Sequence, residues 1–163
     1  MREHKALVPW SNVVWLKKGI PKQKLLTWLF VLNRCPTRDR LISWGISIDP
    51  ACLLCNDEAE SRNHLFFECD FTRSIWWRLS HKLRLPWTSG SWDTTLQILI
   101  SFKGTQNHRF LILLAWQSLI YETWRERNNR LHRHIAQPSE IAAHPSDNIT
   151  QRSDLRVCSS GLL

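Results

Sequence analysis

Three cysteines and one histidine fall within eighteen residues of this chain, in the stretch CLLCNDEAESRNHLFFEC. Cys52 and Cys55 are separated by two residues, and that gap lets both sulfurs face one point while the backbone between them makes a tight turn. His64 and Cys69 follow, so that the full pattern is C-x2-C-x8-H-x4-C. Three thiolates and one imidazole are a complete tetrahedral ligand set for zinc. The spacing therefore predicts one zinc ion held by Cys52, Cys55, His64 and Cys69.

The same cysteines could instead form disulfides or stand together by chance, and the cellular compartment helps to decide. The N-terminal residues contain no apolar core or small-residue cleavage site of the kind that secretory signals have. The longest apolar run, Phe110 to Trp116, is far shorter than the roughly 20 residues that span a bilayer. We therefore expect an intracellular protein, nuclear or cytoplasmic, without a membrane anchor. A reducing compartment disfavours disulfides and favours metal ligation.

A zinc site with four protein ligands is closed, because no coordination position is left for water. It is therefore structural, and a hydrolytic zinc enzyme would require one ligand to be replaced by water. Two cysteines are left over: we expect Cys35 to pack between the first two helices and Cys158 to be a free thiol. We expect no catalytic residues.

The net charge of +8 favours an anionic partner such as RNA or DNA, although solubility alone would also explain it. Three thiolates outweigh the charge of one zinc ion, so other residues must contact phosphates. The candidates are Arg34, Arg38, Arg40, Arg62, Arg73, Arg78, Lys82, Arg84, Arg125, Arg127, Arg130 and Arg133. Aromatic residues beside the ligands (Phe66, Phe67, Trp76 and Trp77) could stack on bases, but such residues more often form the small core of the finger itself.

Helical periodicity supplies the elements that must position these residues. We expect helices over 21–34, 37–45, 70–83, 93–102 and 107–134, and a finger over 51–70. In the first helix Leu25, Trp28, Leu29 and Leu32 form an apolar stripe, and Gly45 can close the second helix. The prediction is an all-α domain of about five helices with an inserted Cys3His finger over 1–135, followed by a disordered, flexible tail over 136–163.

Several motifs together resemble the zinc-binding domain at the C-terminal end of reverse-transcriptase polyproteins in plant non-LTR retrotransposons. They are Pro21-Lys22, Trp28-Leu29, the run from Thr37 to Gly45, the Cys52 to Cys55 pair, and the run Glu-x3-His-Leu-Phe-Phe-x-Cys from Glu60 to Cys69. The similarity extends from Trp15 to Trp76, and the segment TWRERNNRLH also looks like the region that follows in such elements. The resemblance implies ligand roles for Cys52, Cys55, His64 and Cys69.

The chain has no polymerase signature of its own, because its only tyrosine, Tyr121, is followed by Glu-Thr-Trp rather than by a residue and two aspartates. The leading hypothesis is a non-catalytic zinc module that assists RNA or DNA binding by a reverse transcriptase. The alternative is a structural or protein-interaction module that docks on the polymerase domain without binding nucleic acid. Neither interpretation involves a small-molecule substrate or a membrane.

Overall fold

The computed structural model describes residues 8–85 and 90–133. These residues form the helices α1 (Ser11–Val14), α2 (Pro21–Val31), α3 (Arg38–Ser43), η1 (His64–Glu68), α4 (Asp70–Lys82), α5 (Trp92–Ser101) and α6 (Gln106–Arg133). The described residues contain no strand, only an isolated antiparallel bridge between Ala51 and Ala59. The expectation of an all-α fold with an inserted finger is confirmed. The predicted division near residue 135 and the predicted tail, with Cys158, lie outside the described residues.

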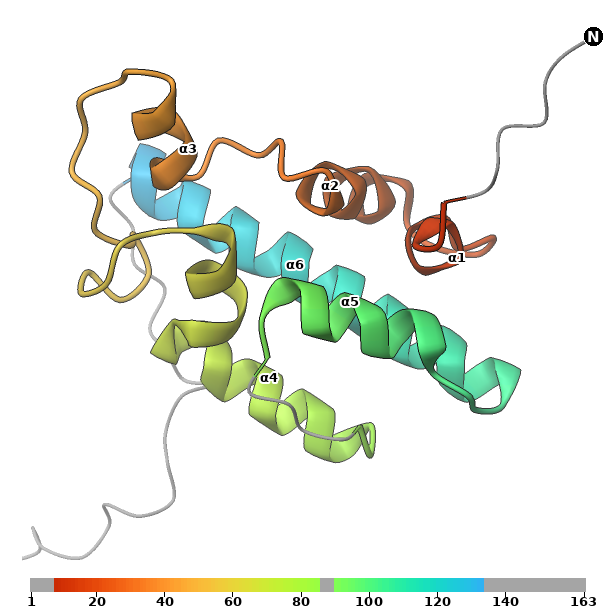
Figure 1. Ribbon diagram of the computed structural model, residues 1–163. Coiled ribbons are helices and arrows are strands. Elements are labelled where there is room, and N and C mark those ends of the chain that lie inside the picture. The colour runs from red at the N-terminus through yellow and green to blue at the C-terminus, as the bar shows by residue number, and fades with distance from the viewer. Residues whose placement is uncertain (1–7, 86–89, 134–163) are drawn as a thin grey trace, which may run out of the picture.

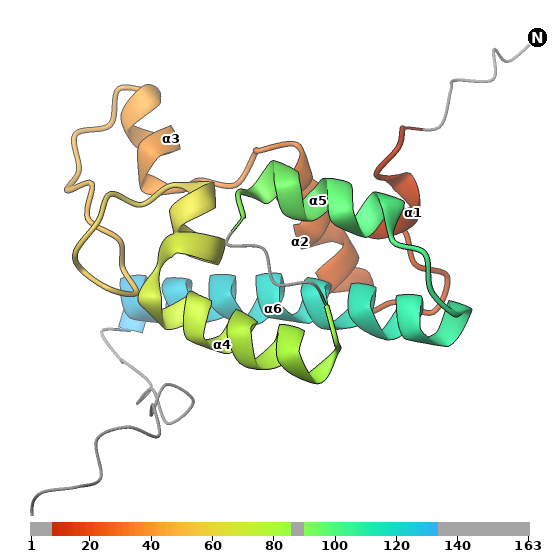
Figure 2. The ribbon, with the colours of Figure 1, turned by 60° about the horizontal axis from the view of Figure 1, so that its bottom comes forward.

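The longest helix, α6, runs the length of the body in both ribbon views (Figures 1 and 2). The finger loop lies at its C-terminal end, and α1 lies toward its other end. Its side chains Ile112, Leu113, Trp116 and Ile120 are all buried, as helical spacing predicts. Helices α1, α2, α4 and η1 all contact α6. This helix therefore connects the finger to the rest of the fold.

Aromatic rings from four segments meet in the centre of the core. Phe30 of α2 is fully buried, and its ring lies edge-on to Phe66 of η1 at 4.7 Å and to Trp124 of α6 at 5.2 Å between centroids. Trp92, the first residue of α5, contacts Trp116 at 5.5 Å. Such edge-to-face and tilted contacts add to the stabilisation that burial alone provides. The core thus joins the finger's helix directly to α2, α5 and α6.

The short helix α1 has no counterpart among the predicted helices, because four residues are too few to show a period. It is held by a tertiary contact from Gln117, which is fully buried in α6. The Gln117 amide Nε2 donates to the carbonyls of Val13 and Val14, each at 2.9 Å. Those carbonyls belong to the last turn of α1, which lacks intrahelical donors.

The predicted apolar stripe of α2 is wrong. Leu25 is 52% exposed, whereas Gln23, Thr27 and Phe30 are buried. The face that packs on α6 is partly polar, and the Ser118 hydroxyl donates to the Gln23 side-chain oxygen at 3.2 Å. Tertiary hydrogen bonding has therefore overridden the hydrophobic pattern. At the C-terminal end of α6, Leu131 is 40% exposed.

Three helices end in the same hydrogen-bonded turn, in which one residue adopts the left-handed conformation. These residues are Asn33 (φ 51°), Gly45 (φ 85°) and Arg84 (φ 51°). In each turn the next residue's amide donates to a carbonyl five positions back, at 2.8 to 3.1 Å. This is the Schellman motif, which favours glycine at the left-handed position. The prediction that Gly45 ends its helix is confirmed. Of the three residues, Arg84 is the one for which the left-handed conformation costs the most free energy.

Among the described residues no helix is long and apolar enough to cross a membrane. Within α6, Arg130 and Glu126 form an ion pair, with Arg130 Nε 2.8 Å from Glu126 Oε1. Helix α4 begins at Asp70 as predicted, whereas α5 and α6 each begin one residue before the predicted start, at Trp92 and Gln106.

Replacing Phe30 with alanine should lower the free energy of unfolding by about 3–5 kcal/mol, because the side chain is fully buried among rings that cannot collapse onto the cavity. Leu25→Ala on the same helix is the control and should change it by at most about 0.5 kcal/mol, because that side chain is exposed. Urea unfolding measures both. Equal effects of the two substitutions would contradict the packing described.

Candidate metal centre

The four predicted ligands converge on one point although they come from two separate segments. One ligand atom from each of Cys52, Cys55, His64 and Cys69 lies within 4.8 Å of every other. Within this group, Cys55 Sγ and His64 Nε2 lie 3.2 Å apart. Cys52 and Cys69 are fully buried, His64 is 5% exposed, and Cys55 is half-buried.

The first ligand pair lies on a small hairpin-like turn. The Cys52 amide donates to the Glu58 carbonyl at 2.8 Å, and the Asn56 amide donates back to the Cys52 carbonyl at 2.8 Å. Asn56 has φ 57°, a left-handed conformation that asparagine tolerates better than most residues. The Leu54 amide points at Cys52 Sγ at 3.4 Å. The turn therefore brings backbone donors to the sulfur that must carry negative charge.

The second ligand pair depends on an unusual helix. In an α-helix, five residues turn through about 500°, which would leave His64 and Cys69 about 140° apart around the axis. The segment is instead a π-helix, His64–Glu68, in which the Cys69 amide donates to the His64 carbonyl at 2.7 Å. The wider turn brings residues five apart closer to one face. Single π turns of this kind are frequent at functional sites. The sequence predicted a finger over residues 51–70 but not this π-helix within it.

A hydrogen bond joins the thiols of Cys52 and Cys69. The Cys69 thiol donates to Cys52, and this hydrogen bond lowers the pKa of Cys52, although burial opposes the shift. The same hydrogen bond and burial raise the pKa of Cys69. The hydrogen bond thus favours the thiolate form of Cys52 and the protonated form of Cys69. A cation that binds between them would displace that proton, as zinc does when thiolates ligate it.

The donor set and its spacing fit zinc. Tetrahedral coordination with Zn–S bonds of about 2.3 Å sets sulfur atoms about 3.8 Å apart. The observed limit of 4.8 Å is about 1 Å wider, so small side-chain adjustments complete the tetrahedron. Three sulfurs and one imidazole nitrogen fill all four positions. The chain thus carries one structural Zn²⁺, which confirms the cofactor expected from the sequence.

A buried carboxylate beside the centre was not predicted as a functional residue. Glu60 is fully buried, with 0% accessibility, and Arg127 of α6 is 2% accessible. Arg127 Nη2 donates to Glu60 Oε1 at 2.8 Å, and the Arg38 amide donates to the same oxygen at 3.0 Å. The Leu53 amide approaches Glu60 Oε2 at 3.4 Å. One carboxylate therefore joins α3, the first ligand turn and α6.

Two more arginines hold carbonyl groups of the finger. Arg130 Nη1 of α6 donates to the Leu54 carbonyl at 2.7 Å, and Arg38 Nη1 donates to the Ala51 carbonyl at 2.6 Å. Each carbonyl lies beside a cysteine of the first pair. The C-terminal half of α6 and the start of α3 therefore support the outer turn of the metal centre.

These contacts reduce the number of arginines that are available to bind a phosphate. Arg38, Arg127 and Arg130 are committed to the finger, and Arg62 Nη1 donates to the Phe30 carbonyl at 2.9 Å. Burial also lowers the pKa of Arg62. These four arginines serve the fold. The sequence proposed them as contacts to nucleic acid, but the partners that the structure gives them are groups of the protein itself.

The other predicted arginines lie at or near the surface and are not brought together at one place. Arg34, Arg73 and Arg125 are exposed, and the last two pair with Asp70 and Glu122 on their own helices. Arg40 is half-buried with its guanidinium over the Trp44 ring, and Arg78 is half-buried. The side chain of Arg133 lies outside the described residues.

Of the aromatic residues beside the ligands, Phe66, Phe67 and Trp76 are buried and belong to the core, as the sequence led us to expect. Trp77 is 56% exposed. Cys35 is buried away from the metal centre, and desolvation raises the pKa of its thiol to about 12. It is a packing residue, with no part in the ligand set.

The comparisons with known proteins agree with this geometry. Residues 1–76 match the family described as zinc-binding in reverse transcriptase. The match includes all four ligands and Glu60, and it ends within α4. Searches of curated proteins and of solved structures found no match.

Chelation should remove about one zinc per chain and should abolish protection against hydrogen exchange from Ala51 to Phe71, because this segment depends on the ion for order. Cys55→Ser and His64→Ala should reproduce that loss without a chelator. Hydrogen exchange with mass spectrometry measures the change. Cys35→Ala is the matched control and should keep its zinc, and loss of the ion in this variant would contradict the assigned ligand set.

Glu60→Gln should lower the free energy of unfolding by about 3–5 kcal/mol, because it leaves the buried Arg127 guanidinium without its counter-charge. Glu58→Gln is the control, since that carboxylate is exposed on the same turn. Thermal and urea unfolding of the zinc-loaded proteins measure both. A Glu60→Gln protein as stable as the control would show that the buried pair does not tie the finger to α6.

Proposed function

We propose that this chain is a non-catalytic zinc module, derived from the C-terminal region of a retrotransposon reverse-transcriptase polyprotein, that helps to hold RNA or DNA. The family match to residues 1–76 and the closed ligand set support the zinc half of this function. The observation that carries the nucleic-acid half is the separation of positive from negative charge along the fold. That separation gives one end of the molecule the character of a phosphate-binding surface.

Acidic residues gather around the finger. Seven of the ten aspartates and glutamates in the described segments lie between Asp39 and Asp70. By contrast, residues 8–38 contain six lysines and arginines and no acidic residue. The segments 71–92 and 94–121 also contain no acidic residue. The three thiolates add a further negative charge at the metal, so the finger itself repels phosphate.

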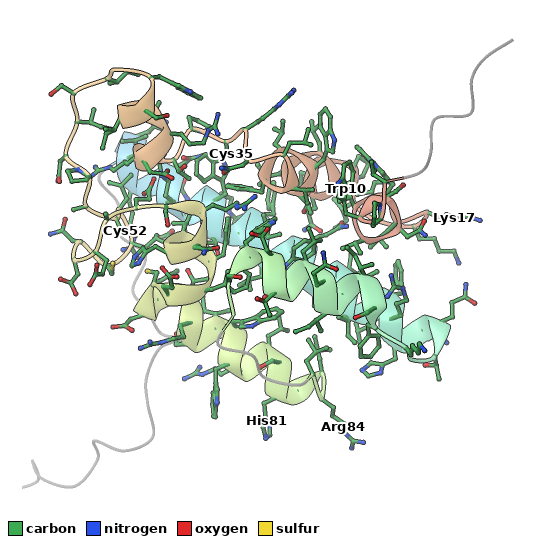
Figure 3. All side chains as sticks on the ribbon, in the orientation of Figure 1. Trp10, Lys17, Cys35, Cys52, His81 and Arg84 are labelled. Atoms are coloured by element: carbon green, nitrogen blue, oxygen red, sulfur yellow. The ribbon has the colours of Figure 1, made fainter. Side chains whose placement is uncertain are left out.

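Apart from Arg34, Arg73 and Arg125, the exposed lysines and arginines of the described segments lie away from the metal centre. They are Lys17, Lys18 and Lys22 near the start of α2, Lys82 and Arg84 at the end of α4, and Lys103 between α5 and α6. Figure 3 shows Lys17 and Arg84 projecting from the body, far from Cys52. Lys82 and Arg84 are among the candidates that the sequence predicted, whereas Lys17, Lys18, Lys22 and Lys103 are not.

Purified zinc-loaded protein should bind single-stranded oligonucleotides at low salt, and the logarithm of the affinity should fall linearly with the logarithm of salt concentration. Replacing Lys17, Lys18 and Lys22 together with glutamine should weaken binding and make that slope shallower by about 0.7 for each phosphate that these lysines neutralise in the native protein. Fluorescence anisotropy measures both quantities.

Arg125→Gln is the control for this experiment, because Arg125 is exposed but already paired with Glu122 near the finger end of α6. It should leave affinity and slope nearly unchanged. Native protein that fails to bind at low salt, or binds without salt dependence, would overturn the nucleic-acid function while leaving the zinc site intact.

An exposed apolar surface favours a second candidate function, docking on a polymerase domain. Trp15 is 47% exposed and lies 6.1 Å from Trp28, between ring centroids. Leu25, one helical turn before Trp28, is 52% exposed, and Ile20 just before α2 is 41% exposed. Trp10 is half-buried, and Trp87 lies outside the described residues. Exposed apolar patches commonly mark protein interfaces.

If this surface docks on a polymerase, the double substitution Trp15→Ala with Leu25→Ala should abolish co-purification with a purified reverse-transcriptase domain while leaving oligonucleotide binding unchanged. Ile42→Ala with Leu111→Ala is the control, because both side chains are exposed elsewhere on the molecule. Unchanged co-purification of the first variant would exclude the docking surface.

A further inference from the structure

The outer face of α4 carries an exposed row of cationic and aromatic side chains that the metal centre does not use. Arg73, Trp77 and His81 recur at four-residue intervals and are all exposed, so they lie along one side of the helix. Lys82 and Arg84 continue the row at the C-terminal end. Figure 3 shows His81 and Arg84 projecting outward from the end of this helix. We call these five residues the α4 row.

Trp77 is the most prominent member of the row. At 56% it is the most exposed large apolar side chain among the described residues, although tryptophan usually buries most of its area. Its ring is stacked with that of His81, with 6.1 Å between centroids and 26° between planes. The two rings are therefore nearly parallel, and both side chains are exposed to solvent.

After Asp70, the charged residues of this part of the sequence have one sign. From residue 71 to residue 92 the sequence has no aspartate or glutamate, and Asp70 pairs with Arg73 at the start of the helix. The sequence places Lys82 and Arg84 beyond the stacked rings, and both are exposed. An aromatic surface bordered by cations at the far end suits a ligand with flat bases and a phosphate backbone.

The conformation of Arg84 is a separate indication. It has φ 51°, in the left-handed position of the turn that ends α4. Asn33 and Gly45 occupy the same position in the other two turns, and both tolerate it more easily than arginine does. The left-handed conformation strains the backbone of arginine at this position, whereas glycine would adopt it without strain. Strain of this kind clusters at functional sites.

We propose that the α4 row binds single-stranded nucleic acid, with a base stacked on Trp77 and His81 and phosphates contacting Lys82 and Arg84. Stacking on an exposed ring requires an unpaired base, because both faces of a base inside a duplex are already covered. This inference rests on the proposed nucleic-acid function and specifies the form of the ligand and the residues that receive it.

The first test compares Trp77→Ala with Trp44→Ala. Trp44 is a matched control, because it is 53% exposed and also lies beside an arginine, at the other end of the molecule. Trp77→Ala should weaken binding of labelled oligo(dT) and oligo(U) of about 12 nucleotides by about fivefold to one-hundredfold, the range of one stacked base. The salt slope should not change, because the substitution removes no charge. Trp44→Ala should bind as the native protein does.

The second test uses the strain at Arg84. Arg84→Gly should leave the melting temperature unchanged or raise it, because glycine suits the left-handed position. The same substitution should weaken oligonucleotide binding and reduce the salt slope by about 0.7, and Lys82→Gln should reduce it by a similar amount. A residue with a purely structural role would show no change of slope.

The outcomes separate this inference from the proposed function. Native protein that binds no oligonucleotide would overturn both. Native protein that binds with a steep salt dependence, while Trp77→Ala and Arg84→Gly bind equally well, would overturn the α4 row alone. Equal reductions of affinity in Trp77→Ala and Trp44→Ala would also overturn it, as would duplex DNA bound as tightly as the single strand. If Trp77→Ala and Arg84→Gly lost binding to a purified reverse-transcriptase domain but still bound oligonucleotides as the native protein does, the α4 row would be assigned to a protein partner instead.

Discussion

The convergence of three sulfurs and one imidazole on a single ion is the constraint on which the rest of this structure depends. The chain between α3 and η1 has few buried apolar side chains of its own, chiefly Leu54 beside the ligand Cys52. A loop of this composition cannot offset the conformational entropy lost on ordering. Metal bonds supply that free energy in small domains of this kind. The fold of the finger and the binding of zinc are therefore one event.

The finger is nonetheless not a separate domain. Glu60 connects the first ligand turn to Arg127, and Arg130 binds the carbonyl beside Cys55, so α6 receives the metal centre as part of its own packing. Phe66 of η1 packs against Phe30 at the centre of the core. Order at the metal is thereby coupled to order along α6. Arg127 and Arg130 make this connection and stabilise the fold. The accessible positive charge lies on other residues.

The sequence alone predicted the all-α class, the principal helices and the ligand set, because each depends on local spacing. It missed α1, which is fixed by Gln117 from more than one hundred residues away along the chain, and the exposed face of α2, where polar contacts with α6 decide the orientation. It also assigned Arg127 to nucleic acid, because a one-dimensional pattern does not show that Glu60 is buried opposite it. The resemblance pattern, which contains Glu60 four residues before His64, was the available signal for this partner.

The most direct test of the account is zinc K-edge X-ray absorption of protein purified without added metal. The account predicts about one zinc per chain with three sulfur ligands at about 2.3 Å and one nitrogen ligand at about 2.0 Å, and no oxygen in the first coordination sphere. Cys69→Ser should lose a sulfur from that set or lose the metal altogether. A native spectrum with an oxygen ligand, with four nitrogen or oxygen ligands, or with no bound zinc would contradict the closed structural site from which the remaining conclusions follow.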